Sequence, residues 1–239
     1  MKISLIIPAR YESSRFPGKP LAMIQGIAML ERTYLQCCKA LDNEFIYVAT
    51  DDERIEKFCK QKNINTIFTS RDCLTGTDRV AEVAKTLDFD IFLNVQGDEP
   101  VFNPDDITTL INESLKHPET IICGYTEIKK DEQYLNNQIP KVIFDKNNYL
   151  LYMSRSPIPG SKKNQLKKAY RQVCAYSFPK DKLEIFGKEK KKSFFEDIED
   201  LEILRFLENG VPVKMLEMSD KSISVDNPED IHEVEKILK

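Results

Sequence analysis

Residues 2–20 read KISLIIPARYESSRFPGKP and join a short apolar run to a polar, basic loop. A continuous apolar run such as 3–7 is typical of a strand that is buried on both faces, as in a parallel sheet. The loop that follows carries Arg10, Arg15 and Lys19 with two serines and a glycine, which are the groups that an anion-binding loop needs. In an open α/β sheet, ligands bind beyond the carboxyl ends of the strands, where this loop is expected. A solvated basic loop is the alternative, since the loop contains neither a Walker motif nor G-x-G-x-x-G.

The composition of the whole chain limits the class of protein. With 239 residues, the chain is long enough for one large α/β domain, or for one domain with a small appendage. The formal net charge of −4 argues against a nucleic-acid partner bound through its phosphates. The six cysteines show no metal-ligand spacing, so free thiols in a reducing cytosol are expected. No stretch approaches the ~18–20 apolar residues of a membrane span. We therefore expect a cytoplasmic protein without a membrane or nucleic-acid partner.

Strands and helices alternate at short spacing after the basic loop. Such alternation is typical of βαβ units and predicts a parallel sheet. The predicted helix 195–205 is amphipathic, with Ile198, Leu201 and Leu204 on its core side. The Lys-rich run 188–192 is expected to be a solvated loop. The other expected helices are 29–41, 54–62, 80–87 (capped by Thr77), 104–115 and a last one to 238, and the other expected strands are 45–50, 64–69, 120–128, 170–178 and 213–217, with a hairpin over 141–153 that turns at 146–148.

Residues 91–100 read IFLNVQGDEP and form the second informative stretch. Gly97 allows close approach of the backbone, and Asp98 is expected at the carboxyl end of a buried strand, facing the crevice. A carboxylate beside a bound triphosphate is repelled unless a cation lies between them, and Mg²⁺ is usually held by one or two carboxylates and phosphate oxygens. Asp98 is therefore a candidate metal ligand. A turn with an exposed aspartate is the alternative.

Residues 8–21 resemble the characteristic loop of the sugar-acid cytidylyltransferases, and the branch that they resemble most is 3-deoxy-manno-octulosonate cytidylyltransferase. In that family the loop holds the triphosphate of CTP, which implies this task for Arg10, Arg15 and Lys19. The segment 71–79 resembles the family segment that lines the nucleotide pocket and reads the cytosine, although locally it also reads as an ordinary capped loop. The nucleotide-binding residues implied by the resemblance are Ala9, Arg10, Ser13, Arg15, Lys19, Arg71, Thr75, Gly76, Thr77, Arg79 and Gln96.

The metal site is also implied by the resemblance. Residues 95–100 match the metal-binding motif of the family without a gap, and residues 225–230 match the segment that supplies its second Mg²⁺ carboxylate. The implied ligands of Mg²⁺ are Asp98 and Asp226, although the second segment also reads as a helix start with acids at its N-terminus. The implied catalytic residues are Arg10, Arg15, Lys19 and Asp98.

The sugar half of the chain resembles the family more loosely. Gln172 stands where the family commonly has His, Cys174 where it commonly has Gly, and Ile203 where its acidic helix has Gln. The departures at 172 and 203 fall on the sugar side, so they leave open which sugar acid is used. A planar, fork-shaped Arg suits the carboxylate of such a sugar. The sugar-binding residues implied by the resemblance are Arg155, Gln172, Tyr176, Glu196 and Glu199.

The resemblance implies a fold and a reaction. The fold is a Rossmann-like three-layer α/β/α nucleotidyltransferase domain with a mostly parallel sheet and a small lid or dimerisation extension at about 126–178. The reaction takes CTP and a sugar acid, most readily 3-deoxy-manno-octulosonate (Kdo), and forms a CMP-sugar for lipopolysaccharide or capsule, with Mg²⁺ as cofactor and a homodimer as the expected assembly. The alternatives are a cytidylyltransferase for 8-amino-Kdo or a nonulosonic acid, a glycosyltransferase of similar fold, and a non-catalytic relative.

Overall fold

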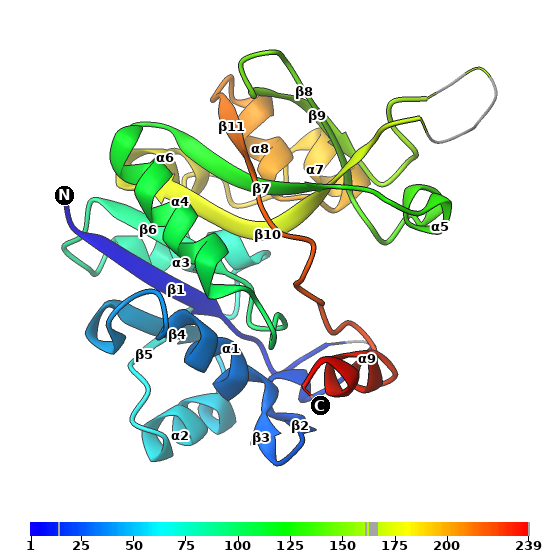
Figure 1. Ribbon diagram of the computed structural model, residues 1–239. Coiled ribbons are helices and arrows are strands. Elements are labelled where there is room, and N and C mark those ends of the chain that lie inside the picture. The colour runs from blue at the N-terminus through cyan, green and yellow to red at the C-terminus, as the bar shows by residue number, and fades with distance from the viewer. Residues whose placement is uncertain (14, 161, 163–166, 239) are drawn as a thin grey trace.

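The structure is a computed structural model that describes residues 1–13, 15–160, 162 and 167–238 (Figure 1). Ser14, one of the two serines of the basic loop, lies outside this part of the chain. Within the described ranges, every helix is too short or too polar to cross a membrane.

The predicted parallel sheet is confirmed. The apolar run at the N-terminus forms a central strand, β1, which pairs in parallel with β4 on one side and with β6 on the other. Strand β10 is antiparallel to both of its neighbours, β6 and β7, and β11 is again parallel to β7. The main path through the sheet is β11-β7-β10-β6-β1-β4-β5. The strands are β1 (Ile3–Pro8), β2 (Met23–Ile24), β3 (Ile27–Ala28), β4 (Ile46–Thr50), β5 (Thr66–Phe68), β6 (Ile91–Val95), β7 (Ile121–Glu127), β8 (Lys141–Phe144), β9 (Leu150–Ser154), β10 (Tyr170–Pro179) and β11 (Val213–Glu217).

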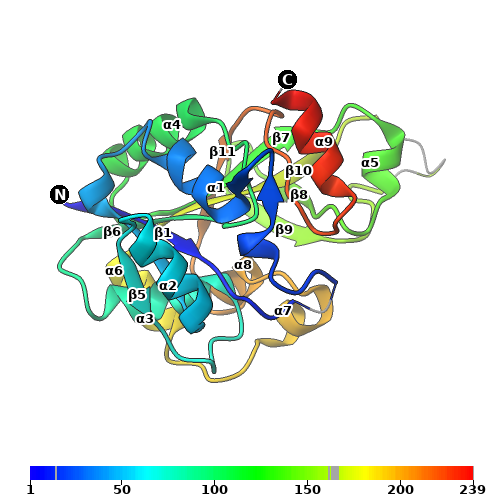
Figure 2. The same cartoon turned by 90° about the horizontal axis from the view of Figure 1, so that it is seen from below.

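Helices cover both faces of this sheet and complete the three layers (Figures 1 and 2). One core cluster joins apolar side chains of α3, α6 and α8 to one face, and a second joins those of α1, α2 and α4 to the other. Strands buried on both faces read as continuous apolar runs for this reason. The helices are α1 (Met29–Cys37), α2 (Glu53–Gln61), α3 (Gly76–Ala84), α4 (Pro104–Lys116), α5 (Asp131–Leu135), α6 (Lys180–Phe186), α7 (Phe194–Glu199), α8 (Ile203–Glu208) and α9 (Asp230–Ile237), with short 3-10 turns at Lys19–Leu21 and Asn43–Phe45.

The predicted hairpin over 141–153 is present and extends the sheet near β10. Strands β8 and β9 pair with each other, and β8 also pairs with the start of β10. Asn148 has a φ of 63°, which supplies the left-handed residue that the turn needs. The ammonium of Lys141 is buried and donates to the carbonyls of Asn136, Ile139 and Arg155 at 2.8, 2.7 and 2.6 Å. This single side chain therefore ties the hairpin to the loop that precedes it.

The prediction for the helix after the segment 71–79 was wrong at its start. Helix α3 begins at Gly76, and its N-cap is Thr75, not Thr77. The Thr75 hydroxyl accepts from the Asp78 amide at 3.2 Å, while the Asp78 carboxylate accepts from the Thr75 amide at 2.8 Å. This reciprocal capping box satisfies two amides that a later start would leave free.

The single helix predicted over 195–205 was also wrong. The chain breaks at Asp200, which has a φ of 53° and separates α7 from α8. The carboxylate of Glu196 contacts the guanidinium of Arg205 at 2.6 Å, although nine residues of straight helix would separate them by about 13.5 Å along the axis. The break brings these two side chains together. It also leaves Ile198 64% exposed, so Ile198 is not on the core side, whereas Leu201 and Leu204 are buried as predicted.

Candidate nucleotide and sugar site

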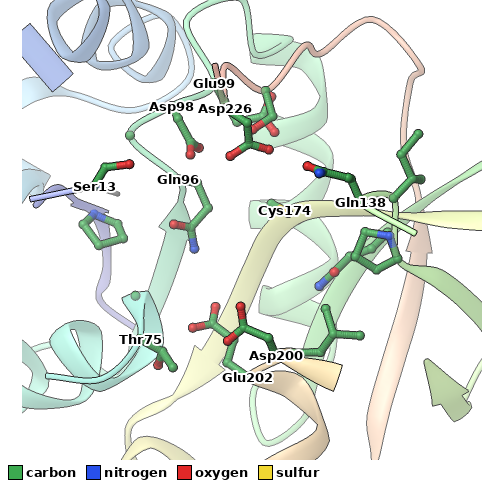
Figure 3. Close-up of a pocket in the computed structure, with 18 of the residues that line it drawn as sticks. Ser13, Thr75, Gln96, Asp98, Glu99, Gln138, Cys174, Asp200, Glu202 and Asp226 are labelled. Atoms are coloured by element: carbon green, nitrogen blue, oxygen red, sulfur yellow. The ribbon is translucent and has the colours of Figure 1, made fainter. Parts of the chain in front are cut away.

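The stretches singled out in the sequence converge on one cavity of about 950 Å³ beyond the carboxyl ends of β1 and β6 (Figure 3). This is where open α/β sheets bind ligands. The wall is contributed by parts of the segments 8–20, 73–79, 96–99, 136–140, 171–176, 192–202 and 222–230. Figure 3 shows acidic side chains at two places in the cavity: Asp98, Glu99 and Asp226 lie at one, and Asp200 and Glu202 lie at the other.

The basic loop lines the cavity as predicted, and two of its cations contact the predicted metal ligands. The Lys19 ammonium lies 2.7 Å from Asp98 Oδ2 and 3.7 Å from Asp226 Oδ1. The Arg15 guanidinium lies 3.0 Å from the same Asp226 oxygen and also donates to Gln138 Oε1 at 2.9 Å. Arg10 is exposed on the cavity wall. The cations expected for the triphosphate therefore pair with the carboxylates expected for the metal.

A third carboxyl group, that of Glu99, stands beside these two and was not predicted. Glu99 is 4% exposed, and its Oε2 has no hydrogen-bond partner within the described part of the chain. Burial raises the pKa of Glu99 to about 8, with a further contribution from the charge of Asp98, while Arg171 opposes the shift. Orphaned buried oxygens are rare in folded proteins. This end of the cavity therefore holds three carboxyl groups, and among the described residues one of their oxygens, Glu99 Oε2, has no partner.

The small and uncharged residues among the predicted nucleotide residues of 71–79 lie at the start of α3. Gly76 packs against Gln96, because a Cβ at position 76 would lie 3.0 Å from the Gln96 amide nitrogen, and both residues line the cavity. Thr75 also lines the cavity and caps α3. The amide of Thr77 donates to Glu202 Oε2 at 2.9 Å. Figure 3 shows Thr75 and Glu202 at the end of the cavity away from Asp98, with Gln96 between Thr75 and Asp98. Thr77 is absent from the described cavity lining.

The two arginines predicted near the nucleotide have other surroundings. Arg79 reaches the cavity wall, but its guanidinium is buried and donates to Asp51 at 2.7 Å and to Thr69 at 2.6 Å. Through these two contacts, Arg79 links α3 to the residues that follow β4 and β5. Arg71 is exposed and is absent from the lining of the cavity within the described ranges. Of the two, only Arg79 belongs to the described cavity lining, and the assignment of both to the nucleotide remains a prediction.

On the sugar side, Gln172 and Tyr176 lie together in the cavity wall. Both are buried, and Gln172 Nε2 donates to Tyr176 Oη at 2.8 Å. Cys174 lines the cavity beside them. Ile203, by contrast, is fully buried in the core cluster formed with α3 and α6 and is absent from the described cavity lining. The departures at 172 and 203 therefore do not act together, because only the first alters the wall of the cavity.

The two predicted sugar-binding acids are occupied by contacts within the protein. Both oxygens of Glu196 bind Arg205, at 2.6 and 2.7 Å, and both residues are buried. Glu199 accepts from the Ser154 hydroxyl at 2.6 Å and from the Arg155 amide at 2.8 Å, and it is absent from the described cavity lining. Their assignment to the sugar remains a prediction.

Several cavity residues were missed by the sequence analysis. The wall also includes Gln138, Arg171, Lys192, Asp200 and Glu202. Glu202 follows Glu196 and Glu199 at the same spacing of three residues, so this spacing could have identified it. The solvated-loop prediction for 188–192 fails at Lys192, which forms an ion pair with Asp200. The remaining residues carry no local pattern that points to a ligand.

Comparison with known proteins agrees with the fold and the cavity. A family model described as cytidylyltransferase matches residues 4–223. The 8-amino-3,8-dideoxy-manno-octulosonate cytidylyltransferase of Shewanella sp. (strain W3-18-1) is 40% identical, over 100% of this chain and 99% of the relative. The 3-deoxy-manno-octulosonate cytidylyltransferase of Geotalea daltonii (strain DSM 22248 / JCM 15807 / FRC-32) is 41% identical over 100% and 99%.

A solved structure, described as CMP:2-keto-3-deoxy-manno-octonic acid synthetase complexed with CTP, superimposes with a TM-score of 0.92. It is 31% identical to this chain and covers 100% of it, while 98% of that structure is matched in return. The predicted three-layer nucleotidyltransferase fold is thereby confirmed. Together with the family model and the full-length relatives, this similarity establishes that the chain belongs to the cytidylyltransferase family.

Proposed function

We propose that this protein is a CTP-dependent sugar-acid cytidylyltransferase that joins CMP to Kdo and releases pyrophosphate. The observation that carries the proposal is one cavity whose lining combines the basic loop, the carboxylates of Asp98 and Asp226, and the polar side chains of Gln172 and Tyr176. The charged side chains suit an anionic nucleotide and its metal ion, and the polar side chains suit the hydroxyl groups of a sugar acid. The 8-amino derivative of Kdo is the second candidate, because a relative that is 40% identical over the full length bears its name.

In the proposed reaction, the anomeric hydroxyl of the sugar acid attacks the α-phosphorus of CTP. A new P–O bond forms, the bond from the α-phosphorus to the bridging oxygen breaks, and pyrophosphate leaves with the electron pair, while the hydroxyl proton passes to solvent. Such transfer depends on positioning and on neutralisation of charge. We assign Arg10, Arg15 and Lys19 to the triphosphate, because all three line the same wall of the cavity. Binding of the leaving group by these cations lowers the cost of its negative charge.

We further propose Mg²⁺ as the cofactor, held by Asp98 and Asp226. The donor set fits this ion: a single cation, the Lys19 ammonium, already lies near an oxygen of each carboxylate and 2.8 Å from the Val225 carbonyl. Hard oxygen donors of this kind suit Mg²⁺. When bound, the ion supplies Lewis-acid polarisation of the phosphate and lowers the pKa of the attacking hydroxyl.

The test of the reaction is pyrophosphate release from CTP and Mg²⁺ with a panel of sugar acids: Kdo, 8-amino-Kdo, N-acetylneuraminate, legionaminate and pseudaminate, with a control without sugar. Turnover with Kdo alone supports the main proposal, and turnover with 8-amino-Kdo alone supports the second. Turnover only with a nine-carbon acid contradicts both. If no acid supports pyrophosphate release, the proposed function is contradicted.

The metal assignment has its own test. Asp98→Asn is expected to reduce the rate by a factor of 10² or more, in line with the loss of one positioned charge-stabilising group, and to weaken Mn²⁺ binding measured by electron paramagnetic resonance in the presence of CTP. Asp105→Asn, at an exposed acid on α4, is the matched control and should change neither quantity. Wild-type Mn²⁺ affinity in Asp98→Asn would remove Asp98 from the metal site.

We also propose that the protein is a cytoplasmic homodimer whose product serves lipopolysaccharide or capsule synthesis. The exposed apolar side chains Leu151 on β9 and Phe194 and Ile198 on α7 support a contact surface near the extension at 126–178, because clustered exposed apolar groups mark interaction sites. The rings of Tyr152 and Phe195 lie 6.0 Å apart, which places β9 beside α7. A monomeric mass in light scattering would contradict the dimer.

A further inference from the structure

The arginine that the family resemblance assigns to the sugar is already occupied. Arg155 Nε donates to the Glu199 carbonyl at 2.6 Å, and one terminal nitrogen donates to the Asp200 carbonyl at 3.1 Å. The other terminal nitrogen donates to the carbonyls of Asn137 and Gln138 at 3.3 and 3.4 Å. A guanidinium has five N–H donors in a fixed fork. A carboxylate that bound Arg155 through both of its oxygens would therefore have to displace backbone contacts that hold the cavity wall.

The backbone of Arg155 is fixed as well as its side chain. Its carbonyl accepts from the buried Lys141 ammonium at 2.6 Å, and Lys141 also binds the carbonyls of Asn136 and Ile139. Its amide donates to Glu199 at 2.8 Å. Backbone groups buried in this way are costly to leave unpaired. Arg155 therefore holds two segments of the wall together.

A second cation in the same wall is less engaged. Arg171 lies on β10, is half-buried and lines the cavity. Within the described residues, its side chain makes one long hydrogen bond, to the Gln172 carbonyl at 3.5 Å, and no ion pair. Its charge partly opposes the rise in the pKa of Glu99 that burial causes, and Glu99 follows Asp98 in the chain. Arg171 is thus an available guanidinium near the end of the cavity where Asp98 and Asp226 lie.

The structure of the sugar acid indicates where its carboxylate must lie in the cavity, and this step rests on the proposed function. In a 2-keto sugar acid, the kind named for the structurally similar synthetase, the carboxylate is bonded directly to the anomeric carbon, which also carries the attacking hydroxyl. The carboxylate must therefore lie close to the reacting phosphate and to Asp98 and Asp226. Arg171 lines this cavity and its charge acts on Glu99, the residue next to Asp98, whereas Arg155 is anchored to the Glu199–Asp200 segment.

We propose that Arg171 binds the carboxylate of the sugar acid, and that Arg155 is a positioning residue that shapes the cavity wall. A guanidinium matches the two oxygens of a carboxylate through parallel hydrogen bonds. This assignment makes Arg171 the group that selects acids over neutral sugars.

The test is steady-state kinetics in which the sugar acid and CTP are varied separately, with Kdo or 8-amino-Kdo compared with its neutral C1 carboxamide. Arg171→Gln is expected to raise the KM for the acid about 10- to 150-fold, to leave the KM for CTP within about twofold, and to abolish most of the preference for the acid over the amide. Arg171→Lys should restore part of that preference, because it restores the charge. Arg155→Gln should lower kcat/KM for the acid and the amide by similar factors.

The outcomes separate the two proposals. Silence of the wild-type enzyme with every sugar acid overturns the proposed function and this assignment with it. An active wild type whose acid preference is unchanged in Arg171→Gln, or is lost in Arg155→Gln instead, overturns the assignment alone. If Arg171→Gln does not fold, the preference measured in Arg171→Lys decides: a ratio of acid to amide equal to that of Arg155→Gln would refute the role of the Arg171 fork.

Discussion

Replacement of Arg205 by Met is expected to destabilise the protein by about 3–5 kcal/mol, because it leaves a buried carboxylate without its partner. The Arg205 side chain is 0% exposed and that of Glu196 is 1% exposed, and they form two hydrogen bonds at 2.6 and 2.7 Å. Arg205 also contacts Asp78 at 2.8 Å and lies 3.7 Å from the ring centroid of Phe186. One side chain thus links α7, α8, α3 and α6 beneath the cavity.

The size of this loss in stability depends on which carboxylate is left without Arg205. After Arg205→Met, Glu196 is enclosed and cannot be solvated, whereas Asp78, with a side chain that is 12% exposed, retains some access to water. The double variant Glu196→Leu/Arg205→Met removes both buried charges, and a buried ion pair replaced by apolar groups of similar volume is often neutral for stability. The double variant should therefore regain about half or more of the free energy of unfolding lost in the single one.

Urea denaturation followed by circular dichroism measures the difference. With a urea m-value of about 3 kcal/mol/M for a chain of this size, a loss of 3–5 kcal/mol moves the midpoint down by about 1–1.7 M. The result also tests the family-based role of Glu196. A midpoint that stays within about 0.3 M in Arg205→Met, together with a raised KM for the sugar acid in Glu196→Gln, would refute the structural argument and return Glu196 to the sugar site.

Two further changes test other parts of the cavity. Gly97→Ala places a Cβ 2.9 Å from the Pro8 carbonyl oxygen, so it should force the ends of β1 and β6 apart and cost about 1–3 kcal/mol as well as activity. Gly210→Ala is not suitable as a control because Gly210 has a φ of 70°, so Gly160→Ala, whose Cβ would meet no described residue within 4 Å, is the control and should leave the urea midpoint unchanged. The pKa of Glu99 is raised to about 8 in the folded protein, so its stabilising contribution is complete below about pH 4.5 and is lost as the pH rises through about 8. Glu99→Gln should flatten the decline in the free energy of unfolding across that window in the presence of EDTA, and an identical decline in wild type and variant would contradict the shift.

The parts of the fold that could be predicted depend on short-range physics. The run at 3–7 is apolar because β1 has a neighbour on each side and a helix layer on each face. Asp52, a residue type that commonly caps helices, precedes the predicted helix 54–62 and caps α2 by accepting from the Arg54 amide at 2.9 Å. The failures occurred where a distant residue decides the local structure. The residues around Asp200 carry no local pattern that predicts a left-handed conformation there. Asp200 instead contacts Arg155 and Lys192, which lie in other segments of the chain.

The same distinction separates the two halves of the cavity. The loop at 8–20 and the carboxylate of Asp98 follow strands directly, so the fold class alone places them at the crevice. The sugar half is assembled from β10, from the end of β9 and from the segment around α7 and α8. Its side chains can form hydrogen bonds with each other as well as with a ligand. Whether an arginine there binds a ligand or a carbonyl depends on which partners the fold has already supplied. Sequence spacing carries no information on that competition.

Competition for partners also affects the nucleotide half of the cavity. Lys19 and Arg15 pair with Asp98 and Asp226. Under the proposed function, CTP and a divalent ion would replace these ion pairs, because the triphosphate would pair with the cations and the ion with the carboxylates. Neither ligand alone satisfies both sets, because a triphosphate by itself meets unshielded carboxylates and an ion by itself meets the Lys19 ammonium. The arrangement therefore favours joint binding of nucleotide and ion. Loss of Lys19 removes a partner of the triphosphate and at the same time frees the carboxylates for the ion, so its effects on nucleotide affinity and on ion affinity should have opposite signs.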